Sequence, residues 1–186
     1  ALGARLGTGC GPDTITVSLS TLTRHLDKAV EIFADVVVNP TFPARDFTRL
    51  QQQRLAAIQR EKSDPNGVAL RVLPRLMFGA DHPYAAPLSG NGDEAGVSAL
   101  TCDDLQRFYA QWFRPEQATL TVAGAVTLER LLPVLERRFG VWRAMSDSGG
   151  GLPAEGPDTA SAAAARASDL YVLDRPGAAQ SVIVAG

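Results

Sequence analysis

The fold is decided by residues 14–38, which read TITVSLSTLTRHLDKAVEIFADVVV. The first nine residues alternate β-branched or apolar side chains with small polar ones, which is typical of a strand with one buried face. In the remainder, apolar residues recur at helical spacing, and Thr23 is placed to cap the helix that they predict. The members of this apolar stripe are Leu26, Ala29, Val30, Phe33, Val36 and Val37. The sequence therefore predicts a strand that leads directly into an amphipathic helix.

Further strands are predicted before and after this unit. Residues 4–9 can pair with the first strand as a hairpin, because the GPD run at 11–13 has the composition of a turn. Residues 118–125, ATLTVAGA, again alternate apolar and polar side chains. We therefore expect a third strand over that range.

Four more helices are predicted. Pro43 opens the second helix, and the DPNG run at 64–67 breaks it. Thr101 opens the fourth, where Asp104 has the spacing of a capping box. A third helix is expected over 68–78, kinked or split at Pro74, followed by an ordered loop over 79–97. The inward face of the fourth helix is predicted to be Leu105, Phe108, Tyr109 and Trp112, and a fifth helix over 128–139 is closed by Gly140.

The order of these elements predicts an α+β fold. Strands and helices are partly segregated, and the hairpin is antiparallel, so we expect helices packed on one face of a mainly antiparallel sheet. Residues 1–143 form the predicted main unit. Residues 144–168 are rich in Gly, Ala, Ser, Pro and Asp and are predicted to be a flexible linker. Residues 169–186 contain two further predicted strands, at 170–173 and 181–185.

Composition excludes several classes of partner. The 186 residues carry a net charge of −2, which gives no electrostatic argument for nucleic acid or an anionic membrane. No apolar run is long enough to predict a membrane span. Cys10 and Cys102 are too few for a disulfide scaffold and are predicted to be unpaired thiols.

Motifs for catalysis are missing from the sequence. His25 and His82 are the two histidines, and neither belongs to an HExxH or HxxEH motif. There is also no GxSxG nucleophile motif. The residues Arg54, Arg60 and Lys62 on the second helix are interpreted as a solvated face. The sequence by itself therefore predicts neither a zinc site nor a catalytic residue in this chain.

A succession of motifs nevertheless resembles one family. They are Leu2-Gly3-Ala4, the stretch VSLSTLTRHLDKAVEIFADVVVNPTFP at 17–43, FGADHPYAAPLSG at 78–90, LTCDDLQRFYAQWFRPEQATLTVAGAV at 100–126, LLPVLERRFGVW at 131–142 and DRPGAAQSVI at 174–183. In this order they resemble the pitrilysin/insulinase family of zinc peptidases, the inverzincins, to which mitochondrial processing peptidase belongs. The resemblance covers residues 1–143 and 169–186.

The resemblance implies a fold and a cofactor for the family. Each family unit is an α+β sandwich, units occur in tandem, and two pairs close around an unfolded peptide. Catalytic units hold zinc with an HxxEH helix and a glutamate on a later helix. The resemblance makes residues 1–143 the later part of a first unit and residues 169–186 the opening strands of a second.

Carried over to this sequence, the resemblance implies a non-catalytic unit. The later helix is present, but the position of the glutamate ligand is occupied by Ala57, and the nearest carboxylate after it, Glu61, lies one turn further along. A methyl group cannot bind zinc, so we expect no cofactor in this chain and zinc only in catalytic relatives. His82 and Tyr84, in the GADHPY stretch, are candidate contacts to a peptide or to a partner unit.

Three interpretations of function remain open. The first is a non-catalytic unit that walls the peptide chamber and supports peptide binding by an active partner. The second is a piece of an active zinc endopeptidase whose HxxEH lies upstream. The third is a structural core or assembly protein. The expected partners are a peptide or unfolded polypeptide, a second peptidase-family unit, and further copies of this chain, and the resemblance favours a bacterial periplasmic location.

Overall fold

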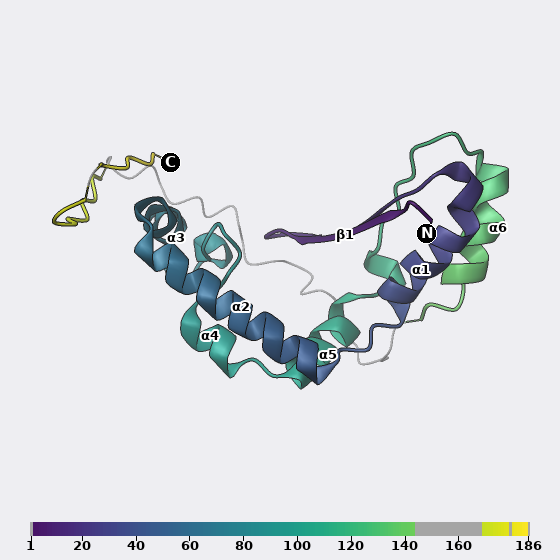
Figure 1. Ribbon diagram of the computed structural model, residues 1–186, viewed down its shortest axis with the longest axis horizontal. Coiled ribbons are helices and arrows are strands. Elements are labelled where there is room, and N and C mark those ends of the chain that lie inside the picture. Colours follow the sequence, from purple (N-terminus) through teal and green to yellow (C-terminus); the bar gives the residue numbers. More distant parts are fainter. Residues whose placement is uncertain (1, 144–168, 179, 186) are drawn as a thin grey trace. The chain divides into compact units, whose positions relative to one another are not determined.

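The computed structural model describes residues 2–143, 169–178 and 180–185. By its internal contacts the chain divides into two compact units: unit 1 is Ala1–Phe47 with Thr101–Gly149, and unit 2 is Thr48–Leu100 with Gly150–Gly186. In chain order, the elements are β1 (Arg5–Cys10), β2 (Ile15–Ser20), the 3-10 turn η1 (Thr23–His25), α1 (Leu26–Val38), α2 (Ala44–Ser63), α3 (Pro65–Phe78), η2 (Pro83–Ala85), α4 (Glu94–Ala99), α5 (Cys102–Trp112), η3 (Pro115–Gln117) and α6 (Leu128–Phe139). Figure 1 labels most of these helices and strands.

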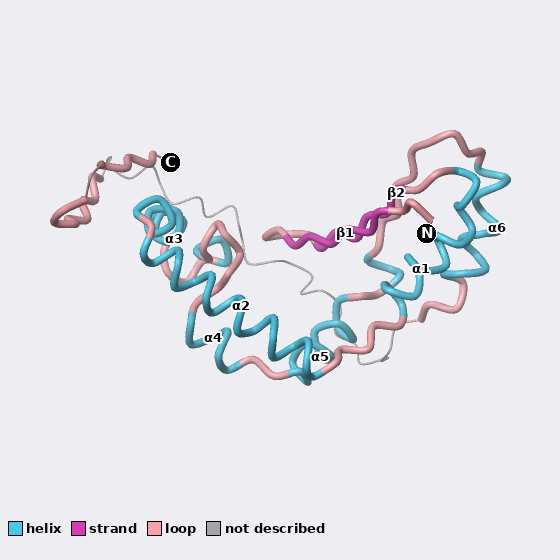
Figure 2. Tube along the Cα trace, viewed as in Figure 1, coloured by secondary structure: helices cyan, strands magenta, loops and turns pink. Residues whose placement is uncertain are grey.

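The predicted hairpin is present in unit 1. β1 and β2 pair antiparallel, with Leu6 opposite Leu19 and Thr8 opposite Val17. The turn is closed by the Gly11 N–H, which donates to the Thr14 carbonyl at 2.8 Å. Since side chains alternate across a strand, the two leucines lie on one face of the hairpin. Figure 2 shows the two strands in magenta.

α1 packs against α6 in unit 1 (Figure 1). Ala29, Val30 and Val37 of the predicted apolar stripe are buried on α1, and so is Ala34, which the stripe did not include, whereas Val36 of the stripe is 40% exposed. The rings of Phe33 and Phe139 meet edge to face, with centroids 5.9 Å apart. The predicted cap at Thr23 is wrong. Thr23 begins the 3-10 turn η1, and the N-cap residue of α1 is His25, whose side chain makes no capping hydrogen bond.

α5 is held to the end of α1 by one buried tyrosine. The Tyr109 hydroxyl donates to the carbonyls of Val37 at 2.8 Å and Val38 at 3.0 Å. Its ring also meets Phe42 edge to face at 5.7 Å. Phe42 has a φ of 45°, a strained value for a non-glycine residue, and this packing helps to keep it there.

The start of α5 confirms the predicted capping box. Thr101 accepts a hydrogen bond from the Asp104 N–H, and the Asp104 carboxylate accepts one from the Thr101 N–H. The predicted inward face is only partly correct, since Tyr109 is buried but Leu105, Phe108 and Trp112 are exposed. Helical periodicity identified the apolar stripe, but the described part of the chain does not cover all of it.

Unit 2 is built on α2 and α3, which are separated by the single residue Asp64. The Asp64 carboxylate accepts from the Gly67 N–H at 2.6 Å and caps α3. A Cβ on Gly67 would lie 2.6 Å from the Glu61 carbonyl oxygen, so glycine permits the two helices to approach closely. α3 contains Pro74 as predicted but is not split by it. The Leu70 carbonyl, which Pro74 cannot serve, accepts instead from the Leu88 N–H at 3.5 Å.

Several predicted elements differ in the structure. The loop predicted over 79–97 includes η2 and the start of α4. Residues 118–125, 170–173 and 181–185 are not in strands, because a strand needs a hydrogen-bonded neighbour and the sheet of the described residues contains β1 and β2 only. The linker predicted over 144–168 lies outside the described residues. The α+β class itself is confirmed, whereas the division into a first unit, linker and second unit stays a prediction.

Replacing the tyrosine that joins α5 to α1 tests this packing. Tyr109→Phe leaves two carbonyls without their donor, and we expect unfolding to require about 1–2 kcal/mol less. Urea denaturation followed by tryptophan fluorescence measures this, because Trp112 and Trp142 both belong to unit 1. Tyr171→Phe is the matched control, since Tyr171 is 62% exposed. Equal losses in the two variants would contradict a specific role for the Tyr109 hydroxyl.

Candidate functional site

The candidate site lies on α2, at the position that the family resemblance assigns to a zinc ligand. Ala57 occupies it and is half-buried. Arg54 precedes it by three residues and Glu61 follows it by four, so at 3.6 residues per turn the three share one side of the helix. The next residue, Ile58, is fully buried and anchors α2 in unit 2.

Glu61 forms an ion pair with Arg71 of α3. The Arg71 Nη1 lies 2.7 Å from the Glu61 Oε2, and the two side chains are only 13% and 18% exposed. Arg71 also donates from Nη2 to the Gly92 carbonyl at 2.7 Å. One guanidinium therefore ties α3 both to α2 and to the loop that precedes α4.

Asn91 completes the arrangement from that loop. Its Nδ2 donates to the Glu61 Oε1, and its Oδ1 accepts from the Arg54 Nη1. The glycines on either side of it have φ values of 67° and 71°, which the loop needs in order to turn back onto α2. We call Arg54, Glu61, Arg71 and Asn91 the Glu61 cluster.

The cluster changes the acidity of its carboxylate. Partial burial acts to raise the pKa of Glu61, but hydrogen bonds from Arg71, Asn91 and Ser89, with the charge of Arg71, outweigh burial and lower the pKa below its ordinary value of 4.5. Glu61 is consequently an anion whose two oxygens both accept hydrogen bonds.

These residues do not fit a zinc ion. A zinc site needs three or four His, Cys, Asp or Glu donors that converge on one point. Ala57 has no donor atom, and both Glu61 oxygens are taken by Arg71 and Asn91. Among residues 2–143 and the described residues after 168, no group of three or more such side chains could hold a metal ion.

The polar side of α2 makes more contacts than the sequence indicates. Gln51 donates from Nε2 to the carbonyls of Val97 at 2.8 Å and Leu100 at 3.0 Å. Lys62 pairs with Glu94 at the start of α4. The interpretation of Arg54 and Lys62 as a solvated face is thus wrong in part, because both bind the segment around α4. Asn91 and Arg71 were not singled out from the sequence, since neither belongs to a periodic pattern or a motif that points to α2.

The two histidines belong to different units. His25 belongs to unit 1 and its Nε2 accepts from the Arg24 Nε at 3.2 Å. His82 belongs to unit 2, where it is the N-cap residue of η2 and its Nδ1 accepts from the Tyr84 N–H at 3.1 Å. The structure therefore brings His82 and Tyr84 together, and it also places both against Phe78.

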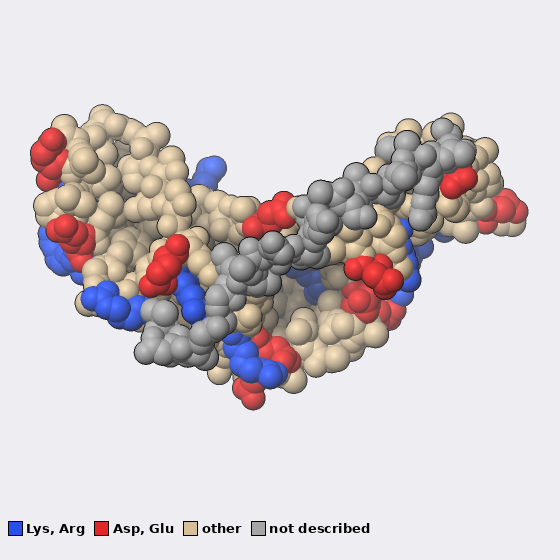
Figure 3. All heavy atoms as spheres, turned by 180° about the vertical axis from the view of Figure 1, so that it is seen from behind, with Lys and Arg blue, Asp and Glu red and all other residues tan. Residues whose placement is uncertain are grey.

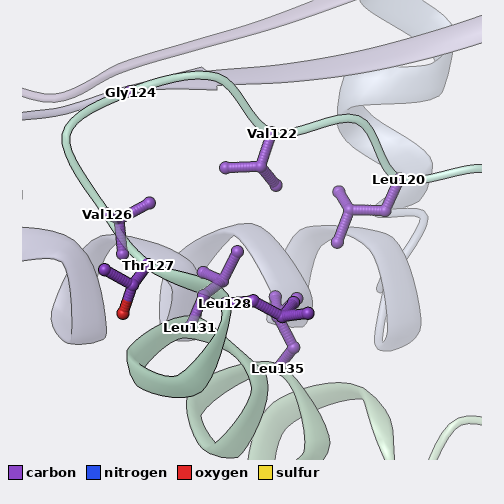
Figure 4. A pocket seen from close by; sticks show the side chains of 8 residues that line it. All are labelled: Leu120, Val122, Gly124, Val126, Thr127, Leu128, Leu131 and Leu135. Carbon is purple, nitrogen blue, oxygen red and sulfur yellow. The ribbon is translucent and has the colours of Figure 1, made fainter.

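Unit 1 contains an apolar hollow of about 380 Å³ beside α6. In Figure 4 the side chains of Leu120 and Val122 point toward Leu128, Leu131 and Leu135 of that helix. The alternation of apolar residues over 118–125 is thus real, although this segment is not in a strand. The hollow has no polar constellation that could support catalysis on its own.

Both acidic and basic side chains occur among the described residues on the face that Figure 3 shows. This agrees with the composition, which gives no single-sign surface for nucleic acid. In the part of the chain that the structure describes, none of the helices combines the length and the apolar character that a membrane span needs.

The comparisons with known proteins now define the class. Residues 1–90 match the family model for insulinase, peptidase family M16, and residues 99–184 match the model for the peptidase M16 inactive domain. The class is therefore that of the α+β peptidase-family proteins, and the second half of the chain matches the inactive domain of this class. It belongs to the pitrilysin/insulinase-type family, M16, as the motifs indicate.

The curated relatives have low sequence identity to this chain, and their descriptions agree with the peptidase family. An uncharacterized zinc protease of Mycobacterium leprae is 27% identical over 140 residues, which are 75% of this chain and 31% of that protein. A probable mitochondrial-processing peptidase subunit beta of Schizosaccharomyces pombe is 25% identical over 119 residues, covering 60% of this chain and 24% of the relative. The chain thus spans about a third or less of the length of these curated relatives.

Two solved structures are similar to this chain. A protease from Helicobacter pylori aligns with a TM-score of 0.72 at 19% identity, covering 82% of this chain and 36% of that one, and supports the fold. A peptidase M16 inactive domain from Pseudomonas fluorescens aligns with a TM-score of 0.55 at 34% identity, covering 59% of this chain and 26% of that one.

Removing the charge of Glu61 tests the cluster. Glu61→Gln leaves the largely buried Arg71 guanidinium without its anion, and we expect a loss of about 1–3 kcal/mol in the free energy of unfolding. Far-UV circular dichroism during urea denaturation measures it. Glu94→Gln is the control, because the Lys62–Glu94 pair is exposed and should contribute no more than about 1 kcal/mol. A smaller loss for Glu61→Gln than for Glu94→Gln would argue against the cluster.

The lowered pKa of Glu61 predicts a pH dependence. A carboxylate whose pKa is lower in the folded chain contributes stability that is fully present above its ordinary value of 4.5 and is lost as the pH falls through the folded-state pKa. Between about pH 7 and about pH 3, we therefore expect the stability difference between the wild type and Glu61→Gln to be constant above 4.5 and to shrink as the pH falls below that value. Other carboxylates titrate in both proteins and cancel in the difference. A difference that is constant over this interval would show that Glu61 is not the group responsible.

Proposed function

We propose that the chain is a non-catalytic unit of an M16 peptidase, which walls the peptide chamber and supports peptide binding by an active partner. One observation carries the proposal: the α2 position assigned to the glutamate ligand holds Ala57, and the carboxylate one turn away is committed to Arg71 and Asn91. Because the Glu61 carboxylate binds Arg71 and Asn91, this face of α2 holds the loop around Asn91 in place and has no side chain left to bind zinc.

Peptide binding is proposed for the hairpin of unit 1. Within the described residues β1 and β2 pair only with each other, so each strand has one edge whose N–H and carbonyl groups are open to an extended chain. A Cβ on Gly9 of β1 would meet nothing within 4 Å, so this glycine leaves room for a close approach of a second backbone. The same edges would let copies of this chain associate with each other, which is part of the proposal.

The active partner is proposed to be a second peptidase-family unit. One relative is described as a subunit of a probable mitochondrial-processing peptidase, which is consistent with function in an assembly of units. The zinc, and with it the hydrolytic chemistry, would be supplied by that partner, and no catalytic residue is assigned to this chain. His82 and Tyr84 are proposed to contact the peptide or the partner.

Zinc stoichiometry tests the proposal. The purified chain is dialysed against trace zinc, its bound metal is measured by atomic absorption, and cleavage of an unstructured fluorogenic peptide is followed in parallel. We expect near-zero zinc per chain and no cleavage. About one zinc per chain would contradict the proposal and favour a piece of an active endopeptidase that uses a carboxylate such as Glu61.

The same preparation distinguishes the structural alternative. A supporting unit should change the peptide affinity or the turnover of the active partner when the two are mixed. A stable complex with no effect on proteolysis would instead identify a structural core or assembly protein.

A further inference from the structure

Three rings meet at the end of α3 in unit 2. Phe78 is the last residue of α3, a helix that Figure 1 labels, and Gly79, with a φ of 90°, turns the chain back toward Phe78. The His82 ring stacks on the Phe78 ring, with centroids 5.2 Å apart and an interplanar angle of 21°. The Tyr84 ring meets Phe78 edge to face at 5.8 Å and lies 5.5 Å from His82. We call Phe78, His82 and Tyr84 the aromatic cluster.

The cluster is ordered and yet open to solvent. Phe78 is 42% exposed and Tyr84 is 36% exposed, although each ring packs against the other two members. Pro83 fixes the backbone between His82 and Tyr84. A ligand that binds such rings loses little affinity to ordering them, because their mutual packing already restricts their rotamers.

The hydrogen bonding of His82 fixes which nitrogen can act as a donor. Its Nδ1 accepts from the Tyr84 N–H, so in the neutral imidazole the hydrogen is on Nε2. No residue that the structure describes accepts a hydrogen bond from this Nε2–H. The cluster therefore combines exposed aromatic surface with one unused donor.

We propose that the aromatic cluster is a recognition site for an aromatic side chain of an extended polypeptide, whose backbone carbonyl accepts from the His82 Nε2–H. This deepens the proposed peptide-binding function and rests on it. Aromatic rings offer the edge-to-face and offset contacts that the three rings already make with each other.

The size of the cluster favours a peptide side chain over a folded partner. Each aromatic side chain buries about 150–250 Å² when fully covered, so the exposed part of three rings is far below the roughly 800 Å² per partner of a stable protein interface. One inserted side chain with its backbone carbonyl matches both the area and the single donor.

The test uses the full chain and fluorescently labelled peptides of one length. Each is an unstructured Gly/Ser peptide with a single central Phe, Leu, Lys or Ala, and affinity is measured by fluorescence anisotropy. We expect the Phe peptide to bind about 3- to 10-fold more tightly than the Ala peptide, the range that one aromatic pair contributes. The Lys peptide tests the alternative that the rings bind a cation through cation–π interactions.

Variants assign the preference to the cluster. Phe78→Leu and Tyr84→Leu should each remove most of the difference between the Phe and Ala peptides. Phe108→Leu on α5 is the matched control, since it deletes a ring that is 47% exposed and lies outside the cluster, and it should leave the difference unchanged. His82→Asn can keep an acceptor for the Tyr84 N–H but lacks the Nε2 donor, and it should weaken all peptides that reach the site.

The outcomes separate this inference from the proposed function. Equal binding of the Phe and Ala peptides, or tightest binding of the Lys peptide, overturns the aromatic site and leaves peptide support intact. A preference for Phe that Phe108→Leu removes as strongly as Tyr84→Leu also overturns it. Failure to bind any of the four peptides overturns both the site and the peptide-binding role. Circular dichroism of each variant confirms that it is folded before affinities are compared.

Discussion

The ion pair between Glu61 and Arg71 is the interaction on which unit 2 depends most. It joins α2 to α3, and through the Gly92 carbonyl and Asn91 it also fixes the loop that leads to α4. A largely buried ion pair is stable only when its remaining donors and acceptors are satisfied. Here both carboxylate oxygens and both terminal nitrogens of Arg71 have partners. Removing one member therefore disturbs two helices and a loop together.

Local patterns in the sequence were sufficient for most elements and insufficient for their surroundings. The hairpin, the capping box at Thr101 and the last helix follow from residues close in the chain. Whether residues 118–125 form a strand depends on a neighbour that no local pattern specifies. In the candidate site, Ala57 and Glu61 could be placed on α2 by the family resemblance. Arg71 and Asn91 could not, because their contacts depend on how α3 and a glycine loop return to α2.

The proposed function rests on how one face of α2 is used. In a catalytic unit the family resemblance implies that this face offers a carboxylate to zinc. In this chain the same face offers a methyl group, and its nearest carboxylate stabilises the scaffold. The match of residues 99–184 to an inactive domain is consistent with that change of use. Among the described residues, the proposed recognition rests on the outer edges of the hairpin in unit 1 and on the aromatic cluster in unit 2.

The hydrogen bonds of Gln51 have a consequence for how the chain folds. Unit 1 is assembled from two stretches that are separated in sequence by residues 48–100. The side chain of Gln51 reaches the Leu100 carbonyl, so the points where the chain enters and leaves this intervening segment lie close together once it is folded. The Tyr109–Val37 contact must close a loop of about 70 residues in an unfolded chain. With residues 48–100 already ordered, most of that loop no longer contributes closure entropy, and the two stretches of unit 1 meet almost as neighbours.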